Sequence, residues 1–279
     1  YIPITDDETY LVGKAPSVAH ARRTALEEVL PSIIALGFDP AKTRIYLHSQ
    51  FPQIYRLATT LSSLVTYNSV RGLFGWQGHE LTGTVFYMGA LQLASILLPQ
   101  LLELGGPKPV LVPVGIDQHP YISLSRDVAR RSSAIAPSEL VWRFLSGLKT
   151  PAAKMSTSTP GNALFLTDDP SEAAKKIRHG YSGGVSVLDV HRELGAIPEV
   201  CAAFELLTYN LDDQEEWEYI RTEYGAGRML TSAVKNRAVE VVAPFLERHH
   251  DLRVDAKSRI DEFLFDRPLP SIDFGRDLF

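Results

Sequence analysis

The sequence predicts an α/β fold, in which a domain with a parallel sheet is followed by a second domain made of helices. Three observations predict it. Short segments rich in β-branched residues alternate with helical patterns in the first half of the chain. One such segment, residues 109–114, ends in a polar turn at residues 115–118, and beyond about residue 160 the patterns are helical. Strands that alternate with helices of these lengths form parallel sheets.

The first strand covers residues 1–5 and runs into an acidic stretch at residues 6–8, which we expect to be a functional loop. A strand that opens a sequence without a preceding turn or cap is typical of the middle of a domain. We therefore expect the first domain to be incomplete at its N-terminus. Ser17 caps a helix that runs to about residue 36, and the β-branched and aromatic residues of 43–47 predict a second strand.

Two further helical patterns cover residues 53–65 and 86–104. The second is apolar over residues 86–98, so it could supply a contact between two copies of the chain. A break rich in glycine and proline then precedes the strand at residues 109–114. Because ligands bind beyond the carboxyl ends of the strands in open α/β sheets, the turn at residues 115–118 is well placed for chemistry.

Helical patterns dominate the second half of the chain. They cover residues 170–179, 188–194, 200–211, 213–224 and 231 to about 265. Asp212 or Asp213 caps the fourth of these helices, and Pro244 is expected to kink or divide the fifth. The irregular residues 267–279 could pack back on the first domain. We therefore divide the chain into residues 1–160 and residues 161–279.

The composition excludes several classes of protein. With 45% hydrophobic and 22% charged residues, the chain of 279 residues is ordinary for a folded soluble protein. Its single cysteine, Cys201, excludes an intrachain disulfide and a multi-cysteine metal site, and fits a cytoplasmic location. The apolar stretch 91–98 is too short to span a bilayer, and no secretion leader opens the sequence. A net charge of −5 does not indicate a nucleic-acid binder, although local basic patches can bind phosphates.

The most specific motif is the run Lys154-Met155-Ser156-Thr157-Ser158. Glycine and proline flank it on both sides, so we expect it to lie on a flexible loop. A lysine on such a loop can meet the negative charge that builds on a leaving pyrophosphate, and small hydroxyl residues can hold the loop by bonding to its backbone. The motif therefore indicates an ATP-dependent reaction.

This run resembles the second ATP motif of class I aminoacyl-tRNA synthetases, and the turn at residues 115–118 resembles one shared by their tryptophan- and tyrosine-specific members. Further stretches are similar to archaeal and eukaryotic tryptophanyl-tRNA synthetases in the same order, namely 5–8, 37–39, 117–121, 126–129, 165–168 and 182–184. The resemblance covers essentially the whole chain. It implies a tryptophan–tRNA ligase with a Rossmann-like nucleotide-binding domain and a helical anticodon-binding domain.

The resemblance also implies roles for individual residues. The residues that match tryptophan-binding positions are Glu8, Gln92 and Gln118. Those that match ATP-binding positions are Asp117, Lys154, Met155, Ser156 and Ser158, with Lys154 and Ser156 in catalytic roles. No residue is assigned as a metal ligand, since Mg²⁺ would arrive with ATP. The implied partners are L-tryptophan, tRNA(Trp) and a second copy of the chain in a homodimer, and no membrane is implied.

Two departures from the family pattern leave alternatives open. The sequence contains no His-x-Gly-His, the first ATP motif of class I synthetases, so we expect this chain by itself to have little activation activity. Pro3 stands where eukaryotic members often have a glutamine that contacts the indole. A tyrosine–tRNA ligase of the same class is therefore an alternative, and so is a non-catalytic paralogue that binds tRNA or acts in signalling.

Overall fold

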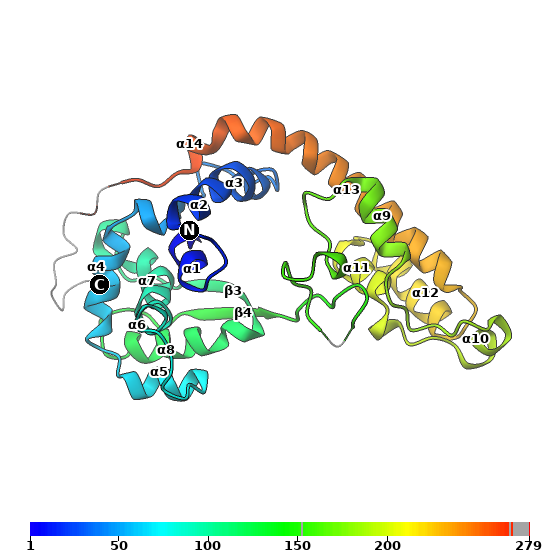
Figure 1. Cartoon of the computed structure of the whole chain (residues 1–279), viewed down its shortest axis with the longest axis horizontal. Helices are drawn as coiled ribbons and strands as arrows, with labels where there is room; N and C mark the ends of the chain where they lie inside the picture. The colour runs from blue at the N-terminus through cyan, green and yellow to red at the C-terminus, as the bar shows by residue number, and fades with distance from the viewer. Residues whose placement is uncertain (152, 268, 270–278) are drawn as a thin grey trace. The chain divides into compact units, whose positions relative to one another are not determined.

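The computed structural model describes residues 1–151, 153–267, 269 and 279, which form two compact units. The first unit comprises residues 1–143 together with 256–279, and the second comprises residues 144–255 (Figure 1). The predicted boundary near residue 160 therefore differs from the observed division at residue 143. The reason is that the loop with Lys154 is held inside the second unit, where the Ser146 amide donates to Glu205 at 2.9 Å.

Within the described residues, the first unit contains four short strands and a larger number of helices. Its strands are β1 (Ile2–Ile4), β2 (Ile45–Leu47), β3 (Leu111–Gly115) and β4 (Ser138–Trp142). Its α-helices are α1 (Asp6–Leu11), α2 (Val18–Thr24), α3 (Leu30–Ile34), α4 (Gln53–Ser62), α5 (Tyr67–Phe74), α6 (Thr82–Phe86), α7 (Gln92–Leu97), α8 (His119–Ala129) and α14 (Ile260–Phe263). Two π-helical turns are η1 (Ala25–Val29) and η3 (Tyr87–Leu91), and η6 (Ile116–Gln118) is a 3₁₀ turn.

The strands form two small parallel sheets. β1 pairs with β2 in the register Ile2↔Ile45, and β3 pairs with β4 in the register Leu111↔Ser138. The three predicted strands are present and parallel pairing is confirmed, but β4 was not expected from the sequence. β2 also pairs in parallel with Leu264, so the chain returns to this sheet after the second unit.

Several helices differ from their predictions. The acidic stretch 6–8 lies in the first turn of α1 and is not a loop. Ser17 caps its helix as predicted, with its hydroxyl accepting from the His20 amide at 3.1 Å, and the helical path continues through η1 and α3 to Ile34. The helix α5 was not predicted, and the helix expected from residue 86 already begins at Thr82.

The core of the first unit is built around the α6–α7 stretch. The stretch Thr82–Gln100 is long and apolar enough to cross a membrane by length and composition, but 44% of it is buried inside the protein. Its apolar residues, including Leu93, Ala94 and Leu97, pack against α4 and α8 in the main core cluster. The prediction that residues 86–98 are available for a contact between two copies is therefore wrong for these side chains, because the unit's own core covers them.

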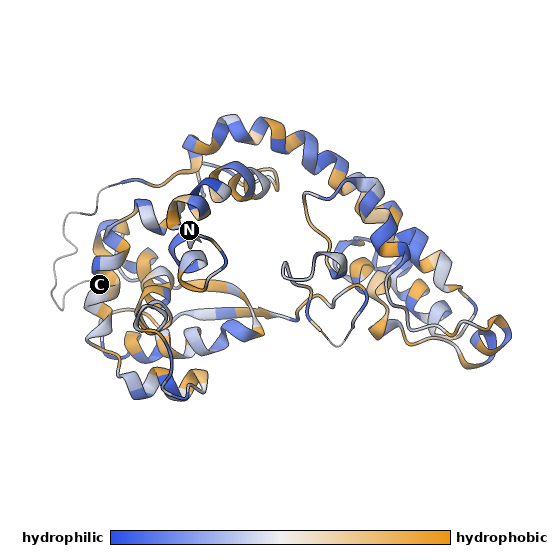
Figure 2. Ribbon diagram, viewed as in Figure 1, coloured by the Kyte–Doolittle hydropathy of each residue, from blue (hydrophilic) through white to orange (hydrophobic). Residues whose placement is uncertain are grey.

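The second unit is helical. Its helices are α9 (Pro170–Arg178), α10 (Leu188–Leu194), α11 (Ala202–Asn210), α12 (Gln214–Gly225) and α13 (Thr231–Ala256), the last of which ends where the first unit resumes. All five predicted helices are present, and Asp213 caps α12 by accepting from the Glu215 and Glu216 amides. The prediction for Pro244 is wrong in part, since α13 continues through it without division. Hydrophobic and hydrophilic residues alternate along α13 (Figure 2).

Candidate functional site

Glu8 and Gln92, two of the predicted tryptophan-binding residues, are joined by a third side chain, Tyr87. The Tyr87 hydroxyl donates to Glu8 Oε2 at 2.8 Å and accepts from Gln92 Nε2 at 2.8 Å. Thr5 also donates to Glu8 Oε2, at 3.0 Å. The structure therefore brings together residues from the start of α1 and the start of α7, and adds a tyrosine that the sequence did not single out.

A π-helical turn makes the contact between Tyr87 and Gln92 possible. Residues five apart point in different directions in an α-helix, which has 3.6 residues per turn. In the turn η3 the Gln92 amide bonds to the Tyr87 carbonyl, so one extra residue fits into the turn and the two side chains meet. Reading the helix with the ordinary period hides this pair, which explains why the sequence did not reveal Tyr87.

Gln118 lies on the same cavity as Gln92. This cavity, of about 400 Å³, is lined by β1, β3 and residues of α7 and α8, including Pro3, Gln92, Gln118 and Tyr121. Asp117 is the neighbour of Gln118 in η6 but is exposed and is not among the lining residues. The three predicted tryptophan-binding residues are thus brought to one region, with Glu8 reaching it through Tyr87.

The walls of this cavity are formed in part by the strand edges opposite the paired ones. The Ile2 amide donates to the Arg44 carbonyl just before β2. The Ser138 amide, at the start of β4, donates to the Val110 carbonyl just before β3. Pro3 and Pro113 therefore face the other edges of their strands. Proline has no amide hydrogen, which makes it tolerable at an unpaired edge. Pro3 consequently gives the cavity an apolar ring where a glutamine would give an amide.

The electrostatics of the region keep its tyrosines protonated. Burial, together with the neighbouring Glu8 carboxylate, raises the pKa of Tyr87 far above its usual value. Burial raises the pKa of Tyr121 to about 12, with smaller contributions from Glu8 and Asp117. Both hydroxyls therefore carry a hydrogen at neutral pH.

A second polar network lies beside the first. The Asp7 carboxylate accepts from the Tyr55 hydroxyl at 2.8 Å and lies 3.2 Å from His48 Nδ1. His48 Nε2 is 3.0 Å from the Ser95 hydroxyl, which lines the cavity. Burial by itself raises the pKa of Asp7, but His48 and Tyr55 outweigh it and hold that pKa below its usual 3.8. This network, which the sequence did not indicate, braces the start of α1.

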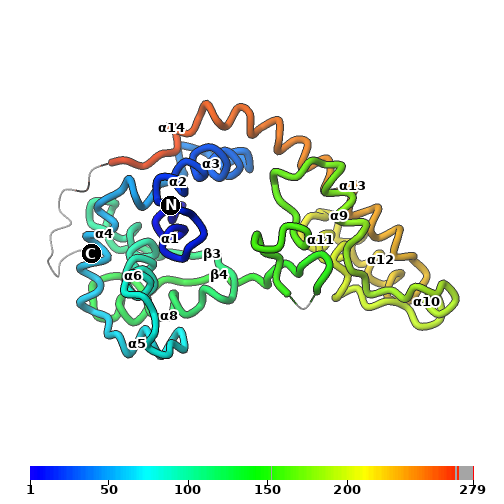
Figure 3. The backbone as a smooth tube through the Cα atoms, viewed as in Figure 1, coloured from blue at the N-terminus to red at the C-terminus, as the bar shows by residue number. Residues whose placement is uncertain are grey.

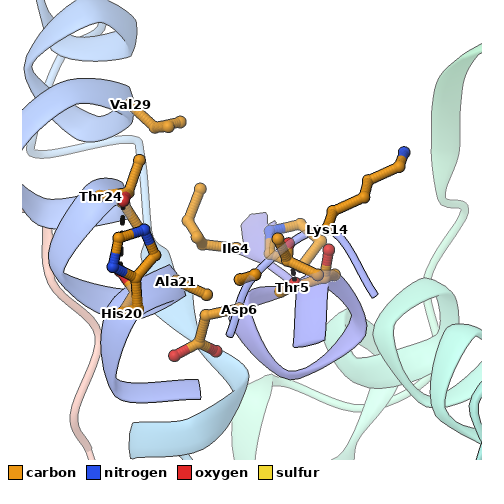
Figure 4. A pocket seen from close by; sticks show the side chains of 12 residues that line it. Ile4, Thr5, Asp6, Lys14, His20, Ala21, Thr24 and Val29 are labelled. Atoms are coloured by element: carbon orange, nitrogen blue, oxygen red, sulfur yellow. Dashed lines mark hydrogen bonds between the residues drawn. The ribbon is translucent and has the colours of Figure 1, made fainter. Parts of the chain in front are cut away.

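A different cavity, of about 410 Å³, opens beside β1, α1 and α2 (Figure 4). Its polar lining includes Thr5, Asp6, Lys14 and His20, and Lys14 extends away from the other polar groups. Asp6 is buried and accepts from the Ser49 amide at 3.0 Å. None of the predicted site residues lines this cavity.

The predicted catalytic loop lies in the second unit. Around it the Gly147 amide donates to the Ala153 carbonyl at 2.8 Å, and the Met155 amide donates to the Leu145 carbonyl at 2.7 Å. These bonds close the loop like the base of a hairpin, and Ser146 and Lys154 face each other in an antiparallel bridge. Between residues 153 and 169 the backbone has no helix longer than the turn Pro160–Asn162 (Figure 3).

The side chains of the motif have distinct environments. The Lys154 ammonium lies 4.9 Å from the centre of the Phe144 ring, which is a cation–π distance. The Ser156 and Ser158 hydroxyls are 2.7 Å apart, and the Ser158 amide donates to Ser156 Oγ at 3.3 Å. Met155 packs against the core of the unit. The residues 154, 156 and 158 therefore share one exposed loop that is anchored by Met155.

No cluster of three or more His, Cys, Asp or Glu side chains that could hold a metal ion occurs within residues 1–151, 153–267, 269 and 279. The single cysteine, Cys201, is buried in the core of the second unit.

Comparison with known proteins shows the family of the chain. A family model described as tRNA synthetases class I (W and Y) matches residues 1–247. The tryptophan–tRNA ligase of Methanopyrus kandleri is 36% identical over 274 residues, covering 96% of this chain and 72% of that protein. The cytoplasmic tryptophan–tRNA ligase of Arabidopsis thaliana is 36% identical over 279 residues, covering 97% and 68%. The crystal structure of the tryptophanyl-tRNA synthetase of Aeropyrum pernix matches with a TM-score of 0.85 and 32% identity over 96% of this chain and 72% of that one. The chain therefore belongs to the class I tRNA synthetase family of the tryptophan and tyrosine enzymes.

Proposed function

We propose that the chain acts as a tryptophan–tRNA ligase, which activates L-tryptophan with ATP and transfers it to tRNA(Trp). The observation that carries the proposal is the hydrogen-bonded set Glu8–Tyr87–Gln92 next to the cavity that Gln92 and Gln118 line. Relatives that share a third of the sequence over nearly the whole chain are named for this activity. Because the family model covers both tryptophan and tyrosine enzymes, tyrosine is the alternative amino-acid substrate.

In this proposal Glu8, Gln92 and Gln118 hold the ammonium group of tryptophan. An ammonium group has three donors and no acceptor, so it needs oxygen acceptors wherever it leaves water. One carboxylate and two amide oxygens supply both the charge and the number of acceptors. The apolar part of the same cavity, which includes Ile96 and the ring of Pro3, offers a surface for the indole.

The ATP-dependent step is assigned to the loop of the second unit and to Asp117. The carboxylate of tryptophan attacks the α-phosphate of ATP, the bond to pyrophosphate breaks, and the aminoacyl-adenylate forms. Lys154 stabilises the charge on the leaving pyrophosphate, while Met155, Ser156 and Ser158 set the shape of the loop around the phosphates. Asp117 faces the ribose. Mg²⁺ enters with ATP and is held by its phosphates.

The remaining roles follow from the same assignment. The first unit serves as a Rossmann-like nucleotide-binding domain, and its two parallel sheets support this proposal. The helices of the second half serve as the anticodon-binding domain. The protein works in the cytoplasm, which is the location stated in the names of the Schizosaccharomyces pombe and Arabidopsis thaliana relatives. It acts as a homodimer. The dimer contact does not use the buried side chains of α7, such as Leu93 and Leu97.

Amino-acid-dependent ATP–pyrophosphate exchange tests the proposal, with tryptophan and tyrosine assayed in parallel. We expect exchange with tryptophan and none above background with tyrosine. The assay is run on this chain and on the chain extended at its N-terminus with the corresponding segment of the Methanopyrus kandleri enzyme, because the sequence here contains no His-x-Gly-His. Exchange with tyrosine would reassign the substrate, and binding of tRNA without any exchange from either form would reject the ligase.

A further inference from the structure

Tyr87 occupies an unusual place in the site. It is 2% exposed, and its hydroxyl has a carboxylate on one side and an amide on the other. Both hydrogen bonds are 2.8 Å long. A tyrosine hydroxyl has one hydrogen to donate, so the direction of each bond depends on whether the neighbouring group is a donor or an acceptor.

The carboxylate settles the direction of the first bond. Glu8, as a carboxylate, accepts hydrogen bonds and cannot donate one, so the Tyr87 hydroxyl donates its single hydrogen to Glu8 Oε2. The oxygen of Tyr87 is then left as an acceptor. Gln92 can meet it with its NH₂ group and not with its carbonyl oxygen, since two acceptors would repel each other. The orientation of the Gln92 amide is therefore imposed through Tyr87.

This direction determines which oxygens are offered to a ligand. Thr5 and Tyr87 both donate to Oε2 of Glu8. Within the described residues, Oε1 of Glu8 and Oε1 of Gln92 accept no hydrogen bond. Neither is a fully buried atom, so both can be reached by a ligand. A carboxylate oxygen and an amide oxygen, with no competing NH₂ group turned outward, make a site for a group that donates several hydrogen bonds.

We propose that Tyr87 is a positioning residue that turns the Gln92 carbonyl outward and fixes the Glu8 carboxylate, so that both oxygens receive the ammonium group of the amino-acid substrate. The inference rests on the proposed function for the identity of that substrate. The π-helical turn η3 makes this positioning possible, because it places Tyr87 and Gln92, five residues apart, on one side of the helix. Without the Tyr87 hydroxyl, the Gln92 amide can turn its NH₂ group toward the ammonium and repel it.

The test uses Tyr87→Phe, which removes the hydroxyl and keeps the ring. The chain is titrated in a calorimeter with L-tryptophan and with indole-3-propionate, which is tryptophan without its amino group. Tyr224→Phe is the matched control, because Tyr224 is equally buried and its hydroxyl is 3.2 Å from Thr231 in the second unit. We expect Tyr87→Phe to reduce the preference for tryptophan over indole-3-propionate by about tenfold or more, and Tyr224→Phe to leave it within about twofold.

Two further measurements separate positioning from general loss of structure. In a Gln92→Leu background, the Tyr87→Phe change should lower the preference for tryptophan by much less than it does alone, since part of its effect passes through Gln92. The side-chain amide resonances of Gln92, identified in the ¹⁵N spectrum by their loss in Gln92→Leu, should move in the ligand-free Tyr87→Phe protein and stay in place in Tyr224→Phe.

The outcomes distinguish this inference from the proposed function. An unchanged ligand preference in Tyr87→Phe, or amide resonances of Gln92 that do not move, would overturn the role of Tyr87. If the unaltered chain binds neither ligand, or binds both equally, the proposed tryptophan site is wrong. The amide resonances would then still decide whether Tyr87 orients Gln92, because they are measured without ligand.

Discussion

Removing the Glu205 carboxylate should loosen the loop that carries Lys154. Glu205 is 8% exposed and lies on α11, among residues that form the core of the second unit. It accepts a hydrogen bond of 2.9 Å from the Ser146 amide. Ser146 is the residue that bridges to Lys154 across the base of the loop. A buried acceptor on a core helix therefore fastens the loop at the point where its two arms meet.

The size of the effect follows from that contact. Losing the hydrogen bond of the part-buried Ser146 amide to a carboxylate costs about 1.5–3 kcal/mol, so Glu205→Ala should raise the open fraction of the loop by about 10-fold to 150-fold. Glu205→Gln keeps an acceptor and loses its charge. Because hydrogen bonds to charged groups are about twice as strong as neutral ones, this variant should cost less, about 1 kcal/mol, or about 5-fold.

Amide hydrogen exchange measures the opening directly, without any enzymatic assay. The amides of Ser146, Gly147 and Met155 should exchange faster in Glu205→Ala, since each donates to an acceptor at the base of the loop. Glu172→Ala is the control, because Glu172 is exposed and its 3.6 Å ion pair with Lys175 is worth little. If these amides exchange no faster in Glu205→Ala than in the control, Glu205 does not fasten the loop.

Three further predictions concern the site and its surroundings. In the chain that supports exchange, Lys154→Ala should slow pyrophosphate exchange by about 10²-fold or more at saturating substrates; a rate within about twofold of the unaltered protein would remove Lys154 from catalysis. Gln118→Ala should raise the KM for tryptophan several-fold because the ammonium loses an acceptor, whereas an unchanged KM would exclude Gln118 from the pocket. The lowered pKa of Asp7 should stabilise the fold above pH 3.8, and this contribution should disappear as the pH falls through the folded-state value. Unfolding by urea between about pH 2 and 6 should therefore show a weaker loss of stability with acid in Asp7→Asn, and parallel curves for both proteins would contradict it.

The sequence predicted the parts of the fold that local chemistry determines. Weak alternation identified β1, and β-branched and aromatic residues identified β2. An apolar run after a break rich in glycine and proline identified β3, and the cap at Ser17 was correct in detail. The helix α5 carried readable signals that were missed, since Thr66 caps it and Gly75, with φ of 65°, ends it. β4 could not be recognised in this way, because most of its residues are exposed and it shows no alternation.

The sequence proposed candidate site residues one by one, but it did not indicate the network that joins them. Glu8, Gln92 and Gln118 came from resemblance to a family, and nothing in their spacing shows that they meet. Tyr87 was invisible because its contact with Gln92 depends on an extra residue in one helical turn, and hydrophobic periodicity assumes regular turns. Pairing between segments far apart, such as Asp7 with Tyr55, is decided by tertiary packing that no local pattern records.

The return of the chain to β2 has a consequence for how the protein folds as it is made. The Phe265 amide bonds to the Ile45 carbonyl at 2.7 Å, and Phe263 and Phe265 are buried in the first unit. A ribosome that adds about 5–20 residues per second needs several seconds, up to about 20, to synthesise the intervening second unit. During that interval the part of the core that these two aromatic rings fill is exposed to solvent, so the first unit remains incompletely folded. The first unit is thus synthesised largely before the second and yet completes its folding after it, and a chaperone would find it during that delay.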